Sequence, residues 1–198
     1  MDRMWTRLRT WRRQRATSPA DQSAQMNDED AQAVISVLLV CMGNICRSPM
    51  AEGILRQRLA ARPALRVVHV DSAGTHGYHV GAAPDRRAQA AAGRRGVDIS
   101  GLRARQVAAG DFESFDYILA MDRDNLELLL EQADDAHHAK IRLFAEFSRQ
   151  NPGAEVPDPY YGGTTGFERV LDLVEEVSEG LLEELDQALS GGREVRDR

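Results

Sequence analysis

The residues best suited to chemistry lie in one short stretch, VCMGNICRSP, over residues 40–49. It contains Cys41 and Cys46, the only two cysteines of the 198-residue chain. Two cysteines in a chain of this length do not make a disulfide scaffold, and they fit a reducing compartment in which a thiol is reactive or structural. The stretch therefore suggests a redox pair, part of a metal site, or a nucleophile with its own binding loop.

The residues between and after the cysteines can form an anion-binding loop. Gly43 and Asn44 tolerate positive φ angles, so the loop can curl and direct successive amide groups at one centre. We expect a helix to begin there, with Ser48 as its N-cap and Pro49 in its first turn, and its N-terminus adds partial positive charge. The planar fork of Arg47 matches the oxygens of a phosphate.

Cys41 is the thiol that this loop would surround. A thiol beside an arginine at a helix N-terminus is expected to ionise readily, and the Ser48 hydroxyl can donate to the thiolate. Phosphoryl transfer to Cys41 also needs an acid that protonates the leaving oxygen. Asp158, in the Pro-rich segment PDPYYGG, is the favoured carboxylate because it lies in a loop, although Asp-Pro is equally typical of a simple turn.

Alternating strands and helices would hold these residues in place. The run VISVLLVC (34–41) is continuously apolar, as in a strand buried on both faces, and Cys41 lies at its carboxyl end. Further strands are predicted over 66–74, 115–122 and 140–144, and helices from Pro49 to near Pro63 and over 84–96, 124–133 and 166–189. This order predicts an α/β fold: a four-stranded parallel sheet flanked by helices, in a single domain over 32–190 with the phosphate-binding loop after the first strand.

Two of the predicted helices carry specific markers. Gly96 follows the helix over 84–96 as a C-terminal cap. The last helix has an apolar stripe at helical spacing, formed by Phe167, Val170, Leu171, Val174, Val177, Leu181, Leu182 and Leu185.

The termini differ from the body in charge. The net charge is −6, but residues 1–15 hold six arginines and Asp2, about +5, which leaves about −11 on the rest. We expect residues 1–31 to be a disordered Arg-rich tail that is able to touch an anionic surface, and residues 191–198 to be disordered. An acidic body without an apolar span or secretory signal predicts a cytoplasmic protein with no integral membrane segment and no nucleic-acid groove.

Four motifs together, VCMGNICRSPMAE, DSAGTHGY, FDYILAMD and DPYY, resemble the low-molecular-weight protein tyrosine phosphatases. The resemblance runs from about Val34 to Leu189 and includes none of the tail. It implies that Cys41 is the nucleophile, through a cysteinyl-phosphate intermediate, and that Asp158 is the general acid and base. By the same resemblance, phosphate is bound by the loop residues Met42, Gly43, Asn44, Ile45, Cys46, Arg47 and Ser48.

The resemblance also implies supporting residues and a substrate. A hydrogen-bonded group of Asn44, Ser48 and Ser72 would hold the loop, and the aromatic walls around the substrate ring would be Tyr78, Tyr160 and Tyr161. The substrates would be phosphotyrosine-containing proteins and the product inorganic phosphate, with no cofactor or metal. One departure is Leu102, where many members have a histidine that supports the asparagine, so we expect weaker support of the loop here.

Several alternatives remain open. A thiol-dependent arsenate reductase on a similar fold needs further cysteines downstream, and none follows Cys46. Related phosphoarginine phosphatases carry threonine where this chain has Ile45, whose apolar branch favours a phenyl ring. Cys46 is either a buried structural residue or a redox guard that traps oxidised Cys41 as a disulfide. A zinc site that used His76 and His79 with the cysteines is opposed by the charge of Arg47.

Overall fold

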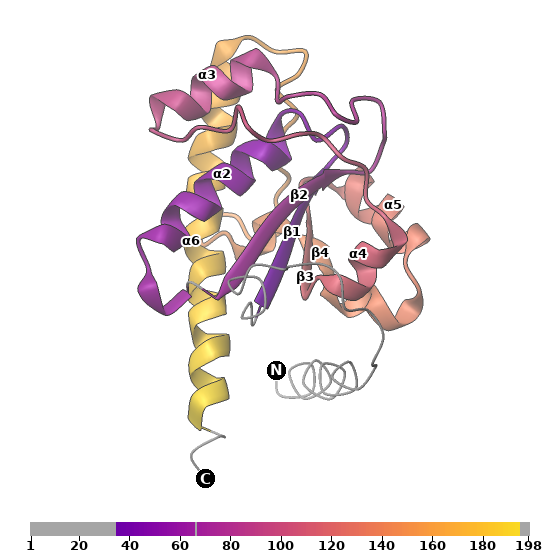
Figure 1. Ribbon diagram of the computed structural model, residues 1–198, viewed down its shortest axis with the longest axis vertical. Coiled ribbons are helices and arrows are strands. Elements are labelled where there is room, and N and C mark those ends of the chain that lie inside the picture. Colours follow the sequence, from indigo (N-terminus) through magenta and orange to yellow (C-terminus); the bar gives the residue numbers. More distant parts are fainter. Residues whose placement is uncertain (1–34, 66, 195–198) are drawn as a thin grey trace, which may run out of the picture. The chain divides into compact units, whose positions relative to one another are not determined.

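A four-stranded parallel sheet lies at the centre of the computed structural model, which describes residues 35–65 and 67–194 (Figure 1). The strands are β1 (Ile35–Cys41), β2 (Val68–Gly74), β3 (Tyr117–Ala120) and β4 (Ile141–Leu143). Their order across the sheet is β2-β1-β3-β4, and every neighbouring pair is parallel. The predicted sheet is therefore confirmed, with β1 in an interior position.

Helices cover both faces of the sheet. They are α2 (Arg47–Ala60), α3 (Arg86–Arg94), α4 (Ala109–Ser114), α5 (Arg123–Gln132) and α6 (Thr164–Glu194), with 3-10 turns η2 (Pro63–Leu65), η3 (Asp135–Lys140) and η4 (Phe144–Phe147). α2 packs on β1 and β2, and α3 and α6 pack against α2 (Figure 1). α4 and α5 lie on the opposite face, where α5 contacts β3 and β4.

Burial on both faces explains why β1 is a continuous apolar run in the sequence. All seven residues of β1 are buried, since α2 covers one face and a second apolar cluster covers the other. That cluster joins Leu38 and Val40 of β1 to Phe112 of α4 and Leu129 of α5. The strand thus presents Cys41 at a fixed position at its carboxyl end, where parallel sheets carry their sites.

The predicted apolar stripe of the last helix is confirmed. All eight apolar residues of that stripe are buried, at 1% exposure or less. The helix is longer than its apolar pattern, beginning at Thr164 and continuing to Glu194, four residues into the segment 191–198 that was expected to be disordered. Residues 195–198 and the predicted tail over 1–31 lie outside the described residues.

α3 ends as its glycine predicts. Gly96 has a φ of 73° and follows the cap residue Arg95. The amides of Gly96 and Val97 donate to the carbonyls of Gly93 and Ala92, at 3.0 Å each, which is the pattern of a Schellman motif. The chain therefore leaves α3 in a defined direction toward the segment that supports the site.

α4 and β3 also differ from the sequence prediction. α4 was not predicted, because a six-residue helix with the single buried residue Phe112 has no apolar periodicity. β3 is shorter than the predicted 115–122, since Asp116 leaves the ladder to accept bonds from the amide and hydroxyl of Ser36, both at 2.8 Å. Neither difference moves the carboxyl end of β1.

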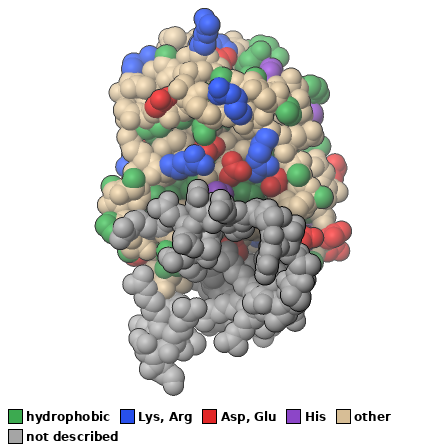
Figure 2. All heavy atoms as spheres, viewed as in Figure 1, with side chains coloured by type: hydrophobic (Ala, Val, Ile, Leu, Met, Phe, Trp, Pro, Cys, Tyr) green, Lys and Arg blue, Asp and Glu red, His purple; other side chains and the backbone are tan. Residues whose placement is uncertain are grey.

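Side chains of both charges lie on the visible face of the described part. Arginines and carboxylates are interspersed on the face shown in Figure 2, so the described residues there form no continuous basic patch. Within residues 35–65 and 67–194, no helix has the length and apolar character needed to cross a bilayer.

Candidate active site

The loop between β1 and α2 carries both cysteines. Cys41 ends β1 and is paired in register with Gly74 at the end of β2. The carbonyl of Cys41 accepts from the Thr75 amide at 2.8 Å, and that of Met42 accepts from the His76 amide at 2.9 Å. A Cβ at Gly74 would lie 2.7 Å from the Met42 carbonyl oxygen, so only glycine allows this close approach.

Asn44 gives the loop its curl. Its φ of 55° is the one positive value among the described residues other than glycine, as expected for an asparagine in the left-handed region. The side chain is 3% exposed and its amide nitrogen donates to the hydroxyls of Ser48, at 2.9 Å, and Ser72, at 2.8 Å. The predicted group of Asn44, Ser48 and Ser72 is therefore brought together.

Ser48 has a different role from the predicted helix cap. α2 begins one residue earlier, at Arg47, and Cys46 occupies the cap position without a side-chain hydrogen bond. The Ser48 hydroxyl instead lies 3.0 Å from the Cys41 sulfur. Because no side chain caps the helix, the amides of its first turn stay available to an anion, and the positive end of the helix faces the loop.

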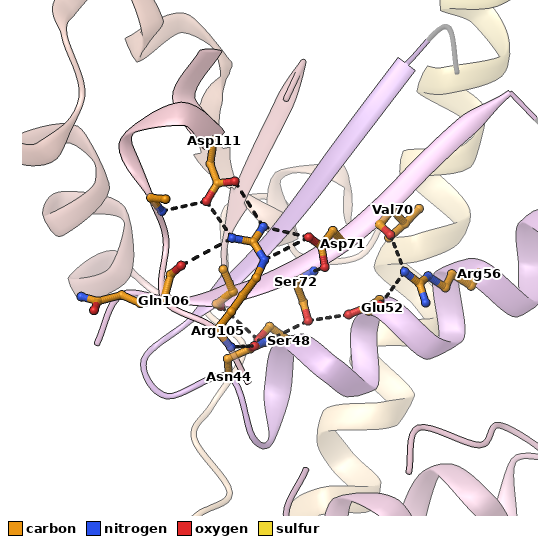
Figure 3. A network of polar contacts seen from close by, with 12 residues as sticks. Asn44, Ser48, Glu52, Arg56, Val70, Asp71, Ser72, Arg105, Gln106 and Asp111 are labelled. Atoms are coloured by element: carbon orange, nitrogen blue, oxygen red, sulfur yellow. Dashed lines mark hydrogen bonds and ion pairs between the residues drawn. The ribbon is translucent and has the colours of Figure 1, made fainter. Parts of the chain in front are cut away.

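Support for Asn44 does not require a histidine at position 102. The oxygen of the Asn44 side chain accepts from the Arg105 amide at 2.9 Å, so the oxygen and nitrogen of this amide group are both bonded (Figure 3). The Arg105 guanidinium is itself fixed by the carboxylates of Asp71 and Asp111, at 2.8 Å each. Leu102 is half-buried, and its amide and carbonyl form hydrogen bonds with Ile99 and Arg103, so the expected effect of Leu102 on loop rigidity stays a prediction.

Glu52 extends this network into the core. Its carboxylate accepts from the Ser72 hydroxyl at 2.5 Å and pairs with Arg56 at 2.8 Å (Figure 3). The side chain is only 2% exposed. Desolvation by burial raises the pKa of Glu52, and the Ser72 hydroxyl and Arg56 offset this in part. The Glu52 carboxyl group therefore orients the hydroxyl that holds Asn44.

Glu52→Gln is expected to change how the free energy of unfolding depends on pH. The folded pKa of Glu52 is raised above 4.5, so its contribution to stability is complete below that value and is lost as pH rises through the folded pKa. The free energy of unfolding of Glu52→Gln should therefore increase relative to that of wild type between pH 4 and pH 7. Urea unfolding across that range measures it.

Glu179→Gln is the matched control for this experiment. Arg62 lowers the pKa of Glu179, so the pH slope should change in the opposite direction. The assignment would be contradicted if the free energy of unfolding of Glu52→Gln, relative to wild type, stayed constant or decreased as the pH rises.

Arg47 is the cation of the site and lies deep in it. It is 3% exposed, and its guanidinium donates to the carboxylate of Asp122, to the Val156 carbonyl at 3.1 Å and to Asp158 at 3.0 Å. Burial alone would lower the pKa of Arg47. The negative charge of Cys41 and of the two carboxylates outweighs burial, and the pKa is raised.

Asp122 was not predicted as a site residue. It follows β3 and caps α5, accepting from the Asn125 amide at 2.7 Å with one oxygen while the other pairs with Arg47. It ends the motif FDYILAMD, and its position after a strand of a parallel sheet is the signal that could have identified it.

Asp158 reaches the site from the loop that precedes α6. One carboxylate oxygen pairs with Arg47, and the other accepts from the Tyr160 amide at 3.0 Å. The side chain is 41% exposed, so this carboxylate lies at the mouth of the loop while Arg47 and Cys41 lie inside.

The three predicted wall tyrosines lie at the surface. Tyr78, Tyr160 and Tyr161 are 74%, 39% and 96% exposed. Tyr78 stacks on His76 with ring centroids 5.1 Å apart, and Tyr160 meets Tyr161 edge to face at 5.0 Å. Their role as walls stays a prediction.

His79, named above only in the zinc alternative, lies against the phosphate-binding loop. A Cβ built on Gly43 would be 2.9 Å from its ring. Its position was not predicted, because nothing in the spacing of residues 43 and 79 brings them together.

Cys46 is the second thiol of the loop. It is 4% exposed, and neither cysteine forms a disulfide. Burial, followed by the charge of Asp85, raises the pKa of Cys46 to about 12. The two thiols therefore have different surroundings: the Cys41 sulfur lies 3.0 Å from the Ser48 hydroxyl, whereas Cys46 is held protonated. Within the described ranges, no group of three or more His, Cys, Asp or Glu side chains is placed to hold a metal ion.

Comparison with known proteins gives consistent matches. The family model for low molecular weight phosphotyrosine protein phosphatases matches residues 36–190. The Bacillus subtilis low molecular weight protein-tyrosine-phosphatase YfkJ is 42% identical over 149 residues, 75% of this chain and 94% of that protein. The human low molecular weight phosphotyrosine protein phosphatase is 43% identical over 141 residues, 70% and 88% of the two chains. The crystal structure of a protein tyrosine phosphatase from Entamoeba histolytica superposes with a TM-score of 0.74 at 39% identity and covers 77% of this chain and 97% of that chain.

Proposed function

Because this chain belongs to the low molecular weight phosphotyrosine protein phosphatases and is a protein-tyrosine phosphatase, we propose that it hydrolyses phosphotyrosine in proteins through a covalent phosphocysteine at Cys41. The observation that carries the mechanism is the contact between Arg47 and Asp158, 111 residues apart in sequence. It brings a carboxylate to the loop that holds the thiol, so nucleophile, anion-binding cation and acid belong to one site.

In the first step, the Cys41 thiolate attacks the phosphorus atom of the substrate. A bond from sulfur to phosphorus forms, the bond from phosphorus to the tyrosine oxygen breaks, and that oxygen takes a proton from the Asp158 carboxylic acid. Arg47 and the loop amides bind the phosphoryl oxygens. The Ser48 hydroxyl, 3.0 Å from the sulfur, is placed to stabilise the thiolate.

In the second step, Asp158 acts as a base. Its carboxylate accepts a proton from a water molecule, whose oxygen attacks the phosphorus of the phosphocysteine. The bond from sulfur to phosphorus breaks, inorganic phosphate leaves, and the thiolate is restored. Because the first step uses protonated Asp158 and the second uses its anion, we expect the rate to be highest at mildly acidic pH.

Phosphotyrosine is favoured over phosphoarginine by the residue at position 45. Ile45 is half-buried in the loop and lies near Gly43. Its aliphatic side chain offers an apolar contact to a phenyl ring but no hydrogen bond to a guanidinium. An arsenate reductase that relays oxidation through further cysteines is disfavoured, since none follows Cys46 in the sequence.

Two peptides of the same sequence test this proposal, one with phosphotyrosine and one with phosphoarginine. Release of inorganic phosphate is measured at mildly acidic pH with a metal chelator present. We expect faster release from the phosphotyrosine peptide, unaffected by the chelator. Absence of hydrolysis, or faster release from phosphoarginine, would overturn it.

Within the proposed mechanism, Cys46 has a protective role for Cys41 against oxidation. Peroxide oxidises the Cys41 thiolate to a sulfenic acid; the Cys46 thiol then attacks that sulfur, water leaves, and a disulfide forms that a dithiol reduces back to two thiols. The raised pKa of Cys46 keeps it protonated, so peroxide reacts with Cys41 in preference. A chemistry that needs free thiols fits a reducing compartment such as the cytoplasm.

Cys46→Ser is therefore expected to recover only a minor fraction of its activity after a peroxide pulse and a dithiol, whereas wild type recovers most of it. Without Cys46 the sulfenic acid is exposed to further oxidation, which a dithiol does not reverse. Activity before and after the pulse measures the effect. Recovery equal to that of wild type would leave Cys46 as a buried structural residue.

A further inference from the structure

Arg87, near the start of α3, contacts the loop that carries Asp158. This loop has no regular secondary structure between η4 and α6 and runs beside α3 (Figure 1). The Arg87 guanidinium donates to the Tyr160 carbonyl at 3.0 Å and to the Gly162 carbonyl at 3.3 Å. A single side chain of α3 therefore binds two backbone groups of the loop.

The contact reaches Asp158 through one residue. Tyr160 accepts from Arg87 through its carbonyl and donates from its amide to the Asp158 carboxylate at 3.0 Å. The Arg87 guanidinium also lies 5.6 Å from the centre of the Tyr160 ring. Holding Tyr160 thus fixes both the backbone and the amide that orient the carboxylate of Asp158.

Arg87 is itself fixed to the phosphate-binding loop. It forms an ion pair with Asp85 at 2.8 Å, and the Asp85 amide donates to the Ile45 carbonyl at 2.8 Å. On its other side, the guanidinium lies 4.8 Å from the ring centre of Phe167, which is fully buried in α6. Arg87 therefore joins the loop of the nucleophile to the loop of the acid.

We propose that Arg87 is a positioning residue that sets the place of Asp158 relative to Cys41 for protonation of the leaving oxygen. The proposal rests on Asp158 as the general acid. A planar arginine fork can bind Asp85 and two carbonyls at once, which a lysine ammonium cannot reproduce with the same geometry. A misplaced acid lowers the rate only where the leaving group needs its proton.

The test compares kcat/KM for two substrates, because this parameter reports the steps through loss of the leaving group. Phenyl phosphate releases a phenol that needs the proton, whereas para-nitrophenyl phosphate releases a more acidic phenol that needs it less. Arg87→Gln should lower kcat/KM about tenfold for phenyl phosphate, within the roughly 10²–10⁴-fold that a general acid contributes, and far less for para-nitrophenyl phosphate. Arg87→Lys should lose nearly as much, since charge alone does not position the loop.

Three further variants make the result specific. Asp158→Asn should show the same selectivity for the leaving group, and Arg87→Gln added to Asp158→Asn should bring no further selective loss. Arg86→Gln, the exposed neighbour on the same turn of α3, should match wild type.

The outcomes separate the two assignments. If Asp158→Asn shows the selective loss but Arg87→Gln lowers both substrates equally, or keeps its effect without Asp158, the role of Arg87 is overturned while the acid stands. If Asp158→Asn itself lowers both substrates equally, the assignment of the acid fails, and the role of Arg87 fails with it.

Discussion

Replacing Cys41 by serine is expected to lower the turnover of para-nitrophenyl phosphate by at least about 10⁴-fold, as loss of a catalytic nucleophile does in other enzymes. A serine hydroxyl stays protonated where a thiol ionises, so the attack on phosphorus loses its nucleophile. Phosphate binding should persist, because Arg47 and the amides of the loop are unchanged. Initial rates at mildly acidic pH and calorimetric binding of inorganic phosphate measure the two effects.

Cys46→Ser is the matched control, since it makes the same chemical change five residues away in the same loop. We expect it to keep most of its turnover before any oxidation, because its raised pKa leaves the thiol uncharged at neutral pH. Turnover by Cys41→Ser within tenfold of wild type would show that another residue attacks the phosphate. Equal losses in both variants would show that the loop tolerates neither substitution, and would remove the distinction between the two thiols.

The different positions of the two cysteines could be predicted from the sequence, because they depend on local order. A continuous apolar run predicts a buried strand, and a parallel sheet places its chemistry where such a strand ends. Cys41 occupies that end and Cys46 follows the bend at Gly43 and Asn44. The long stripe of α6 was predictable for the same reason, since a repeat over many residues reports a buried face.

Contacts between distant residues could not be predicted in this way. Asp122 pairs with Arg47 across 75 residues, and Arg87 binds Tyr160 across 73. No spacing along the chain encodes these contacts; they arise because separate elements meet at one edge of the sheet. For Ser48 the predicted helix cap is wrong, because α2 begins one residue earlier, whereas its predicted contact with Cys41 is present.

The position of Arg47 explains how a buried cation is tolerated in this core. A buried charge is costly unless it is paired and hydrogen-bonded. Asp122, at the start of α5, and Asp158 and the Val156 carbonyl, in the loop before α6, supply those partners. On the proposed mechanism, a phosphate dianion competes with Asp158 for the same guanidinium, so substrate binding and release of Asp158 from Arg47 are coupled.

Arg47→Lys is expected to lower kcat/KM for para-nitrophenyl phosphate by about 10²–10³-fold, the loss typical when a donor to developing anionic charge is removed. The substitution keeps the charge but removes the fork, so an ammonium cannot bind Asp122, the Val156 carbonyl and a phosphate oxygen together. The affinity for inorganic phosphate should fall as well, unlike in Cys41→Ser. Initial rates and calorimetry measure both.

Arg58→Lys is the matched control, because it also replaces a guanidinium by an ammonium. Arg58 lies on the same helix α2 but pairs with Glu175 and Glu179 of α6, away from the phosphate-binding loop. We expect its kcat/KM to stay near that of wild type, because partly exposed ion pairs contribute little and touch no reacting group. If Arg47→Lys retained wild-type kcat/KM and phosphate affinity, the positive charge alone would suffice. The proposal that the planar guanidinium of Arg47 is needed to bind phosphate would then be wrong. The proposed competition between phosphate and Asp158 for this side chain would also lose its basis.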